Sequence, residues 1–215
     1  MTHYYEYSFK CDGFPTPMTL HAITTLFLDG VEHDGFKVTK QGRVVRLTTN
    51  VDLDAEFKTE LNSGNKTITV NLFKKVKHEL PTFEEGDKVA VSGLISAFVR
   101  DQNGKQRCPY YKGKFEVVGG KTLRDPLKLK MQSALGVEIT SMNRGCFTRN
   151  PNEMLNEKIQ INNQLAVTDL MCVVTDAEKF NSLAYRACFS RKSYGMGVMS
   201  IREANQLPQD LKEAV

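Results

Sequence analysis

One feature of this sequence constrains its fold more than any other: strand-like and helix-like patterns follow one another in the same order twice. In the first half, alternating apolar and polar residues predict strands, and apolar residues at helical spacing predict the helices between them. The order is β-α-β-β-α-β, which is typical of the ferredoxin-like fold. We expect strands at residues 4–11, 36–39, 43–49 and 66–76, and helices at 17–28 and 52–61.

Turn and capping residues mark the ends of these elements. Pro17 stands where the first helix can begin, because proline is well tolerated at the first helical position. Gln41-Gly42 separates two alternating segments and predicts a hairpin. Asn50 or Asp52 is available to cap the second helix.

The second half repeats the order after a break at residues 81–86. Gly136 stands where the first helix of this half would stop, and two acids, Asp176 and Glu178, complement the start of the second helix. The sequence therefore predicts an α+β chain of two tandem ferredoxin-like, RRM-like domains at residues 1–80 and 86–202, with a polar tail at 203–215. The strands of the second half are expected at 88–99, 158–161, 165–174 and 198–201, and its helices at 122–135 and 176–189.

Composition excludes several classes of protein. The chain has 215 residues, of which 40% are hydrophobic, so it can bury a core and is neither disordered nor collagen-like. No apolar run approaches the ~18 residues that a membrane span needs, and the first residues lack the pattern of a signal peptide. The five cysteines form no CxxC pair, which favours the thiol-keeping cytoplasm. Without HExxH, a His-Cys cluster or GxxxxGK[ST], we expect no metal, no cofactor and no membrane partner.

The charges are distributed unevenly. Residues 1–36 carry one base and five acids, whereas residues 100–130 carry nine bases and three acids, with Tyr110 and Tyr111 among them. Lysine and arginine neutralise phosphates, and nucleobases stack on aromatic rings, so this stretch is a candidate RNA or DNA surface. A solvated loop and helix face is the alternative. The residues that we assign to this candidate surface include Lys112, Lys114, Arg124 and Lys128.

Two further motifs are candidates for a site. The segment SRKSYGMGVMSI (190–201) has glycines that allow close backbone approach, and we expect exposed N–H groups beside Arg191 and Lys192 to hold phosphate oxygens; a plain turn into a strand is the alternative. His21 lies in the first helix, where a structural role is the alternative to catalysis. Histidine titrates near neutrality and can move the protons when an RNA 2′-hydroxyl attacks its own adjacent phosphate, a reaction that requires no metal.

Together these motifs resemble a known family. PMTLHAITTLFL (17–28), the turn at 103–109, the Leu135-Gly136 helix end and SRKSYGMGVMSI follow one another in the order seen in CRISPR repeat-RNA endonucleases. The branch that the chain resembles is the CasE type, which serves type I-E and some type IV systems. The resemblance implies a tandem ferredoxin-like endoribonuclease that cuts precursor RNA at each repeat hairpin. It also implies 2′,3′-cyclic phosphate and 5′-hydroxyl ends, and a protein that stays on the guide RNA beside other subunits of the interference complex.

The resemblance also implies roles for individual residues. His21 corresponds to the acid/base residue, Lys105 and Arg107 to the basic turn, and Arg191, Lys192, Gly195 and Gly197 to the glycine-rich RNA-binding loop. The sequence departs from the family in two places. Met18 stands where many relatives have a tyrosine, which leaves Tyr194, Tyr5 or His33 as guesses for the second acid/base group, and residues 96–101 lack an Asn-Pro pair.

Two other functions remain open. The missing tyrosine favours a non-catalytic subunit that binds an RNA hairpin within a ribonucleoprotein. A third interpretation is a single-strand-binding module, because residues 86–93 also suit a strand of an OB-type barrel. The helices expected at 17–28, 122–135 and 176–189 leave too few strands for two such barrels.

Overall fold

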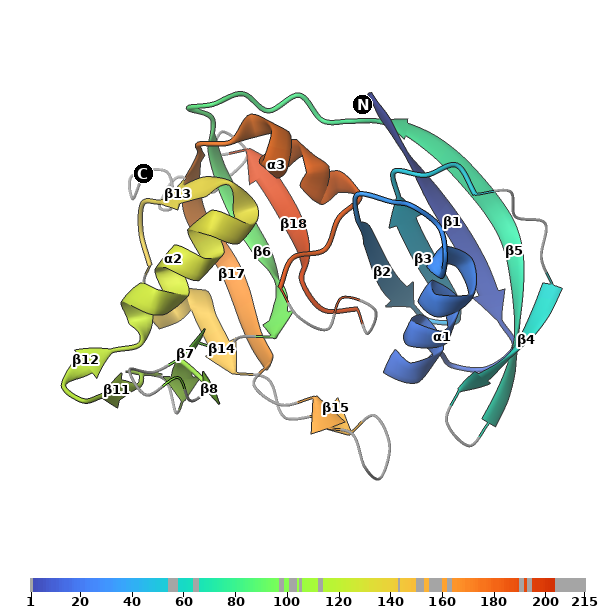
Figure 1. Cartoon of the computed structure of the whole chain (residues 1–215), viewed down its shortest axis with the longest axis horizontal. Coiled ribbons are helices and arrows are strands. Elements are labelled where there is room, and N and C mark those ends of the chain that lie inside the picture. The colour runs from blue at the N-terminus through green and yellow to red at the C-terminus, as the bar shows by residue number, and fades with distance from the viewer. Residues whose placement is uncertain are drawn as a thin grey trace.

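Two antiparallel sheets, each with its own apolar core, make up the protein (Figure 1). Their connectivities confirm the predicted α+β class with tandem ferredoxin-like units. In this computed structural model, no described helix is long and apolar enough to cross a membrane. The structure describes residues 2–53, 58–63, 66–96, 99–100, 104, 106–111, 114–142, 144–149, 153–154, 160–161, 164–189, 192 and 195–203.

The N-terminal sheet has the strand order β2-β3-β1-β5-β4, with all neighbours antiparallel. Without β4, this is the order of a ferredoxin-like sheet, and α1 covers one of its faces (Figure 1). The strands expected at 4–11, 36–39, 43–49 and 66–76 are all present. The elements are β1 (His3–Cys11), α1 (Pro17–Leu28), β2 (Phe36–Gln41), β3 (Val44–Thr49), β4 (Lys58–Ser63) and β5 (Lys66–Glu79).

Helix α1 begins where the sequence predicts, at a proline preceded by a capping box. The Thr16 hydroxyl accepts a hydrogen bond from the Thr19 backbone N–H, and the Thr19 hydroxyl accepts one from the Thr16 N–H. Ile23 and Phe27 are buried on the sheet, and the Phe27 ring lies 4.8 Å from that of Phe9. The helix is therefore fixed at its start and along its apolar face.

The prediction of a helix at 52–61 is wrong for the residues that the structure describes. Residues 58–61 belong to β4, which pairs with β5, and residues 54–57 lie outside the described part of the chain. Leu53 and Leu61 are both buried in the N-terminal core, so these apolar residues do face the core, but not from a helix. Leu61 instead pairs with Ile68 of β5. The spacing of the apolar residues fits a helix or a strand, and pairing with a neighbouring strand outweighs that local pattern.

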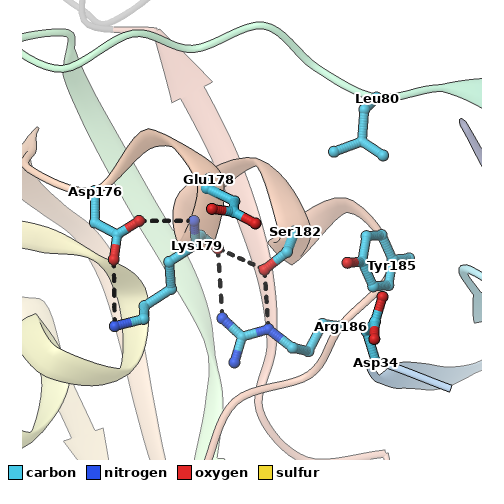
Figure 2. Close-up of a pocket in the computed structure, with 8 residues that line it drawn as sticks. All are labelled: Asp34, Leu80, Asp176, Glu178, Lys179, Ser182, Tyr185 and Arg186. Atoms are coloured by element: carbon cyan, nitrogen blue, oxygen red, sulfur yellow. Dashed lines mark hydrogen bonds and ion pairs between the residues drawn. The ribbon is translucent and has the colours of Figure 1, made fainter. Parts of the chain in front are cut away.

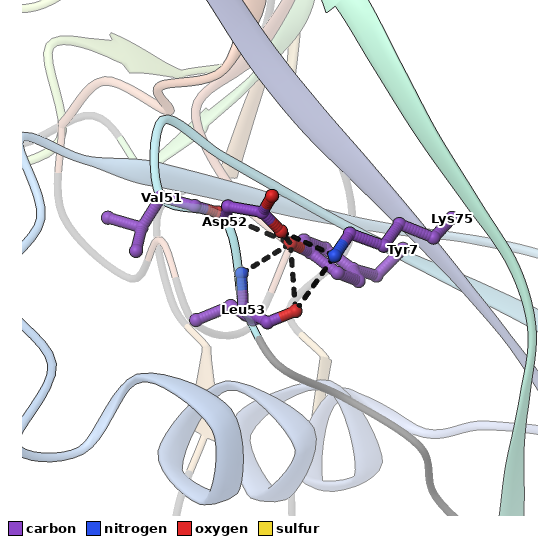
Figure 3. A network of polar contacts seen from close by, with 5 residues as sticks. All are labelled: Tyr7, Val51, Asp52, Leu53 and Lys75. Atoms are coloured by element: carbon purple, nitrogen blue, oxygen red, sulfur yellow. Dashed lines mark hydrogen bonds and ion pairs between the residues drawn. The ribbon is translucent and has the colours of Figure 1, made fainter.

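A polar network ties the segment after β3 to the sheet (Figure 3). The Tyr7 hydroxyl accepts a hydrogen bond of 2.6 Å from the Leu53 N–H, and Lys75 donates to the Leu53 carbonyl at 3.2 Å while pairing with Asp52. The Tyr7 side chain is fully buried, and burial raises its pKa to about 12, so the hydroxyl stays protonated near neutrality.

Replacing Tyr7 by phenylalanine is expected to destabilise the fold by about 1–3 kcal/mol, because the buried Leu53 N–H loses its acceptor. Urea unfolding measures this change. Tyr5→Phe is the matched control: the described contact of Tyr5 in β1 is made by its ring, with Lys75, and should survive. Equal losses for the two variants would contradict this role of the Tyr7 hydroxyl.

The C-terminal sheet has the order β13-β17-β6-β18, with β14 also pairing with β17. This is again the ferredoxin-like order, and α2 ends at Gly136, whose φ of 73° and αL conformation match the predicted stop. The main elements are β6 (Lys88–Ser96), α2 (Arg124–Leu135), β13 (Val137–Ile139), β14 (Phe147–Arg149), β17 (Gln164–Val174), α3 (Ala177–Asn181), the 3-10 turn η2 (Ser182–Ala184) and β18 (Val198–Glu203).

Short strand pairs and one 3-10 turn (η1) occupy the connections of the C-terminal half. These elements are β7 (Val99–Arg100) with β8 (Gln106–Arg107), β9 (Tyr110–Tyr111) with β10 (Lys114–Phe115), β11 (Val117–Val118) with β12 (Lys121–Thr122), β15 (Glu153–Met154) with β16 (Gln160–Ile161), and η1 (Arg144–Cys146). Of the strand expected at 88–99, residues 88–96 form β6 and residue 99 belongs to β7, which pairs with β8, while residues 97–98 lie outside the described part of the chain.

Two expectations for the C-terminal half need correction. Residues 160–161 are the described part of the strand expected at 158–161, and they pair with β15. The place beside β17 in the main sheet is taken by β13 and β14. The helix expected at 176–189 ends at Asn181, followed by η2. Beyond it, the Ala187 N–H donates to Phe36 and the Cys188 N–H to Gly197, so the backbone bonds to other segments instead of continuing a helix.

The connection between the two sheets is attached to α3 by the Asn181 and Phe180 side chains. Asn181 accepts a hydrogen bond from the Phe83 N–H at 3.0 Å and donates one to the Phe83 carbonyl at 2.9 Å. The Phe83 ring also packs edge-on against Phe180, with centroids 5.2 Å apart. The linker is thereby fixed to α3.

Thiol reactivity should follow burial. All five cysteines are free, and burial raises the pKa of Cys11 to about 11 and that of Cys172 to about 12, and it also raises the pKa of Cys188. A raised pKa leaves less thiolate, so iodoacetamide at pH 8 should alkylate these three slowly and the half-buried Cys108 and Cys146 faster. Peptide mass mapping before and after denaturation checks this; native Cys172 reacting as fast as Cys108 would contradict it.

Candidate nucleic-acid interface

The chain between η2 and β18 crosses from the C-terminal sheet to the N-terminal one (Figure 1). The Ala187 N–H donates to the Phe36 carbonyl of β2 at 2.8 Å. Gly35, which the sequence analysis did not single out, lies so close that a Cβ there would come within 2.7 Å of Arg186 Cγ. The segment that carries the glycine-rich loop is therefore attached to the first domain.

Gly195 packs directly against the histidine-bearing helix. Its φ is +85°, and a Cβ there would lie 2.9 Å from Leu20 Cδ1 and 3.5 Å from the Val38 carbonyl oxygen. A glycine is needed both for the backbone conformation and for this approach. Because Leu20 immediately precedes His21 in α1, the structure brings together two motifs that lie near opposite ends of the chain.

Gly197 is held even more tightly. Its φ is +76°, its N–H donates to the Leu94 carbonyl at 2.7 Å, and its carbonyl accepts from the Cys188 N–H at 2.8 Å. The Gly195 N–H donates to the Lys192 carbonyl at 3.0 Å. Both glycine N–H groups thus bond within the chain, so the prediction that N–H groups of this segment hold phosphate oxygens is wrong for these two. The basic side chains of the loop are the groups that could contact a phosphate instead. Lys192 is such a cation, and its backbone is tied to the residue that touches α1.

His21 itself lies in the second turn of α1 and is half-buried, while Leu20 and Ile23 beside it are buried in the N-terminal core. Met18 is also half-buried, one turn before it. Helix packing thus fixes the position of the histidine.

The guesses for a second acid/base group lie elsewhere in this domain or outside the described residues. Tyr5 stands near the start of β1, at the end away from the turn that leads into α1. His33 lies edge-on against Phe36, with ring centroids 5.5 Å apart. Tyr194 falls outside the described part of the chain.

The basic stretch forms a second group. Lys114 in β10 is exposed, Lys128 in α2 is half-buried, and the Arg124 guanidinium donates to the Met142 carbonyl at 3.1 Å. Figure 1 places α2 and β11–β12 across the C-terminal sheet from α1. Arg107, in β8, lies with these short strands. Lys105, Lys112 and Arg191 are outside the described residues.

A hollow of about 490 Å³ between the two domains does not suit a nucleic acid (Figure 2). Arg186 at its edge is held by the Ser182 hydroxyl at 2.9 Å, and Lys179 pairs with Asp176 at 3.4 Å. The Lys179 backbone N–H holds the pKa of Asp176 below its usual value, so that carboxylate is charged at neutral pH. With Asp34 and Glu178 also lining the hollow, it would repel phosphates.

Among the residues that the structure describes, no three His, Cys, Asp or Glu side chains are grouped as metal ligands would be. The site that can be built from the described residues consists of His21 on α1, the loop that carries Lys192 and Gly195 beside it, and a separate basic surface on the C-terminal domain.

Comparison with known proteins gives likenesses to solved structures. No protein-family model matches the sequence, and no curated protein matches it. The CRISPR endoribonuclease Cse3 bound to 19 nt RNA is similar, with a TM-score of 0.58 and 14% identity over 93% of this chain and 98% of that one. Cse3 of Thermus thermophilus, bound to an RNA representing a pre-cleavage complex, gives 0.54 and 16% over 92% and 98%. Cas6e of Escherichia coli K-12 gives 0.51 and 10% over 93% and 99%. At these identities the likeness shows the fold, over nearly the whole chain.

Proposed function

We propose that this protein is a metal-independent endoribonuclease that binds and cleaves CRISPR repeat hairpins in precursor RNA. It would stay bound to the mature guide RNA as a subunit of the interference ribonucleoprotein. The observation that carries the proposal is the packing of Gly195 on Leu20, because it puts the cationic loop beside the His21 helix. The fold shared with RNA-bound Cse3 supports it.

In the proposed reaction, the 2′-hydroxyl before the scissile phosphate attacks the phosphorus, and the bond to the 5′-oxygen breaks. The products are a 2′,3′-cyclic phosphate and a 5′-hydroxyl. His21 takes the proton from the attacking oxygen or gives one to the leaving oxygen. Lys192, whose carbonyl accepts a hydrogen bond from the Gly195 N–H, is the described cation of the loop that would stabilise the charge that develops on the phosphate.

The stem of the hairpin would lie on the basic surface of the C-terminal domain. A-form stems are recognised mainly by shape and backbone contacts, because their major groove is too narrow for side chains to read. Lys114, Lys128 and Arg107 are the described cations there, whereas Arg124 already bonds to the Met142 carbonyl.

Cleavage of a labelled repeat hairpin from the host's own CRISPR array, in EDTA, tests this function. We expect a cut at one phosphate, and acid treatment should open the cyclic end to a 2′- or 3′-phosphate. An RNA of the same composition with a scrambled stem is the control. Equal cutting of both RNAs, or cutting that EDTA abolishes, would contradict the proposal.

A second function is favoured by one observation. Met18 occupies the position one helical turn before His21, and its thioether cannot transfer a proton. A non-catalytic subunit that only binds the hairpin would show tight, stem-dependent binding and no cutting at any pH. The same EDTA assay therefore separates the two functions.

A further inference from the structure

The face of the N-terminal sheet opposite α1 carries a set of cations. In β1, Tyr7, Phe9 and Cys11 point into the core beneath α1. Because successive side chains of a strand point to opposite faces, Ser8 and Lys10 lie on the other face. Arg46 pairs with Ser8 in the register of β3, so it shares this face.

A β-bulge adds an exposed aromatic ring to this face. The pairing of β1 with β5 shifts between Ser8, which opposes Lys74, and Phe9, which opposes Leu72. Phe73 is the extra residue. Leu72 packs against the N-terminal core, so Phe73 next to it points away from that core. Its side chain is 57% exposed, which is unusual for a phenylalanine in the middle of a sheet.

The cations occupy two neighbouring rows across the strands. Arg46, Ser8 and Lys74 form one row, and Lys10, Asn71 and Lys58 form the next. Adjacent strands are about 4.8 Å apart and alternate residues of a strand about 6.8 Å apart, so all four cations and Phe73 fall within one small area.

The acids nearby leave this area positive. Glu6 is the neighbouring carboxylate on β1, and it lies 3.7 Å from the Arg46 guanidinium, which neutralises it. Glu60 stands opposite Thr69 on the edge strand β4, and Asp12 accepts a hydrogen bond from the Thr69 N–H on the other side. Four cations against these three acids leave a net charge of 4 − 3 = +1. Lys10, Lys58 and Lys74 are all exposed.

At its other end the face is bounded by aromatic rings. Tyr4 stacks on His78 with centroids 4.9 Å apart, and Tyr185 of the C-terminal domain lies 6.5 Å from Tyr4. The C-terminal domain thus approaches one end of the sheet, and the cations and Phe73 stand at the open end.

We infer that this open face is a second RNA site, which binds a single-stranded segment with Phe73 stacked on a base and Lys10 and Lys74 on phosphates. An exposed ring among cations is the arrangement that binds unpaired strands, since every base has a face that can stack. A duplex fits less well, because its bases are already stacked on one another. If the proposed function holds, the bound segment is the unpaired RNA that flanks the hairpin.

Fluorescence anisotropy with a labelled, unstructured oligouridine of about 12 nucleotides tests the site, since such sites span ~4–16 nucleotides. Phe73→Ala should weaken binding by about 5- to 150-fold, the range that loss of one stacked base gives. Lys74→Glu should weaken binding and reduce its salt dependence. Leu26→Ala is the control, because Leu26 is 47% exposed on α1, on the opposite face of the sheet, and it should bind as the wild type does.

Equal affinity of the wild type and Phe73→Ala for the oligouridine would overturn the inference, even if the face were then found to bind a protein. Its failure is separable from failure of the proposed function. A hairpin without flanking nucleotides should bind wild type and Phe73→Ala alike, whereas a hairpin with an unpaired flank should bind the variant more weakly. If adding the flank changes the hairpin affinity of neither wild type nor Phe73→Ala, the second site is excluded. The cleavage assay in EDTA then still tests the proposed function independently.

Discussion

Replacing His21 by alanine is expected to slow cleavage of the repeat hairpin by about 10²- to 10⁴-fold, the usual contribution of a positioned acid or base. Hairpin affinity should stay within about twofold of wild type, because the loop and the basic surface that would hold the RNA do not depend on the imidazole. His21 is half-buried beside buried Leu20 and Ile23, so the helix itself should tolerate alanine. Single-turnover rates at saturating protein measure the chemical step.

His3→Ala is the matched control, since His3 is a partly buried histidine of the same domain at the start of β1. It should cut at the wild-type rate. Chemical rescue gives a second measurement: added imidazole should restore part of the cutting by His21→Ala and should leave the wild-type rate unchanged. If His21→Ala cuts as fast as wild type, His21 takes no part in the reaction.

Replacing Gly197 by alanine is expected to destabilise the protein by about 2–5 kcal/mol. The backbone has φ of +76°, a conformation that costs other residues about 1–2 kcal/mol. In addition, a Cβ would overlap the Cys188 carbonyl oxygen and lie 2.7 Å from its carbon, and such overpacking costs about 1–3 kcal/mol. Relief would require the loop to move away from Leu94 and Cys188, which would also displace Lys192 and Gly195 from α1.

Gly42→Ala separates the two causes. Gly42 also has a positive φ, +58°, but nothing lies within 4 Å of a Cβ there. This control should lose about 1–2 kcal/mol, from the backbone conformation alone, and should cut RNA normally. Urea unfolding and hairpin cleavage measure both variants. Equal losses of stability would show that the loop is not packed as the structure has it.

The elements that could be predicted from the sequence are those fixed by local signals. Helix α1 has its proline and capping box, the β2–β3 hairpin has Gln41-Gly42, and α2 has its glycine stop. Strand β4 and the short α3 could not be predicted, because what decides them is distant. Leu61 pairs with Ile68 of β5, and the residues after η2 give their N–H groups to β2 and to the glycine-rich loop.

The candidate site shows the same division. His21 and Gly195 could each be singled out by residue type and neighbours, but their closeness depends on the packing of Gly195 on Leu20. The open face with Phe73 was not predicted, because a β-bulge decides where that ring points. An isolated glycine before β2, Gly35, was the only sequence signal for the contact with Arg186.

The loop before β18 crosses onto α1, and this determines when the proposed site can form during synthesis. All strands of the N-terminal sheet are made before any residue of the C-terminal sheet, so that domain can fold while the rest is still on the ribosome. The loop that packs on α1 is made only after every strand of the C-terminal sheet except β18. A nascent chain therefore carries its histidine helix without the cationic partner, and the proposed cleavage centre is assembled only after most of the C-terminal sheet has been made.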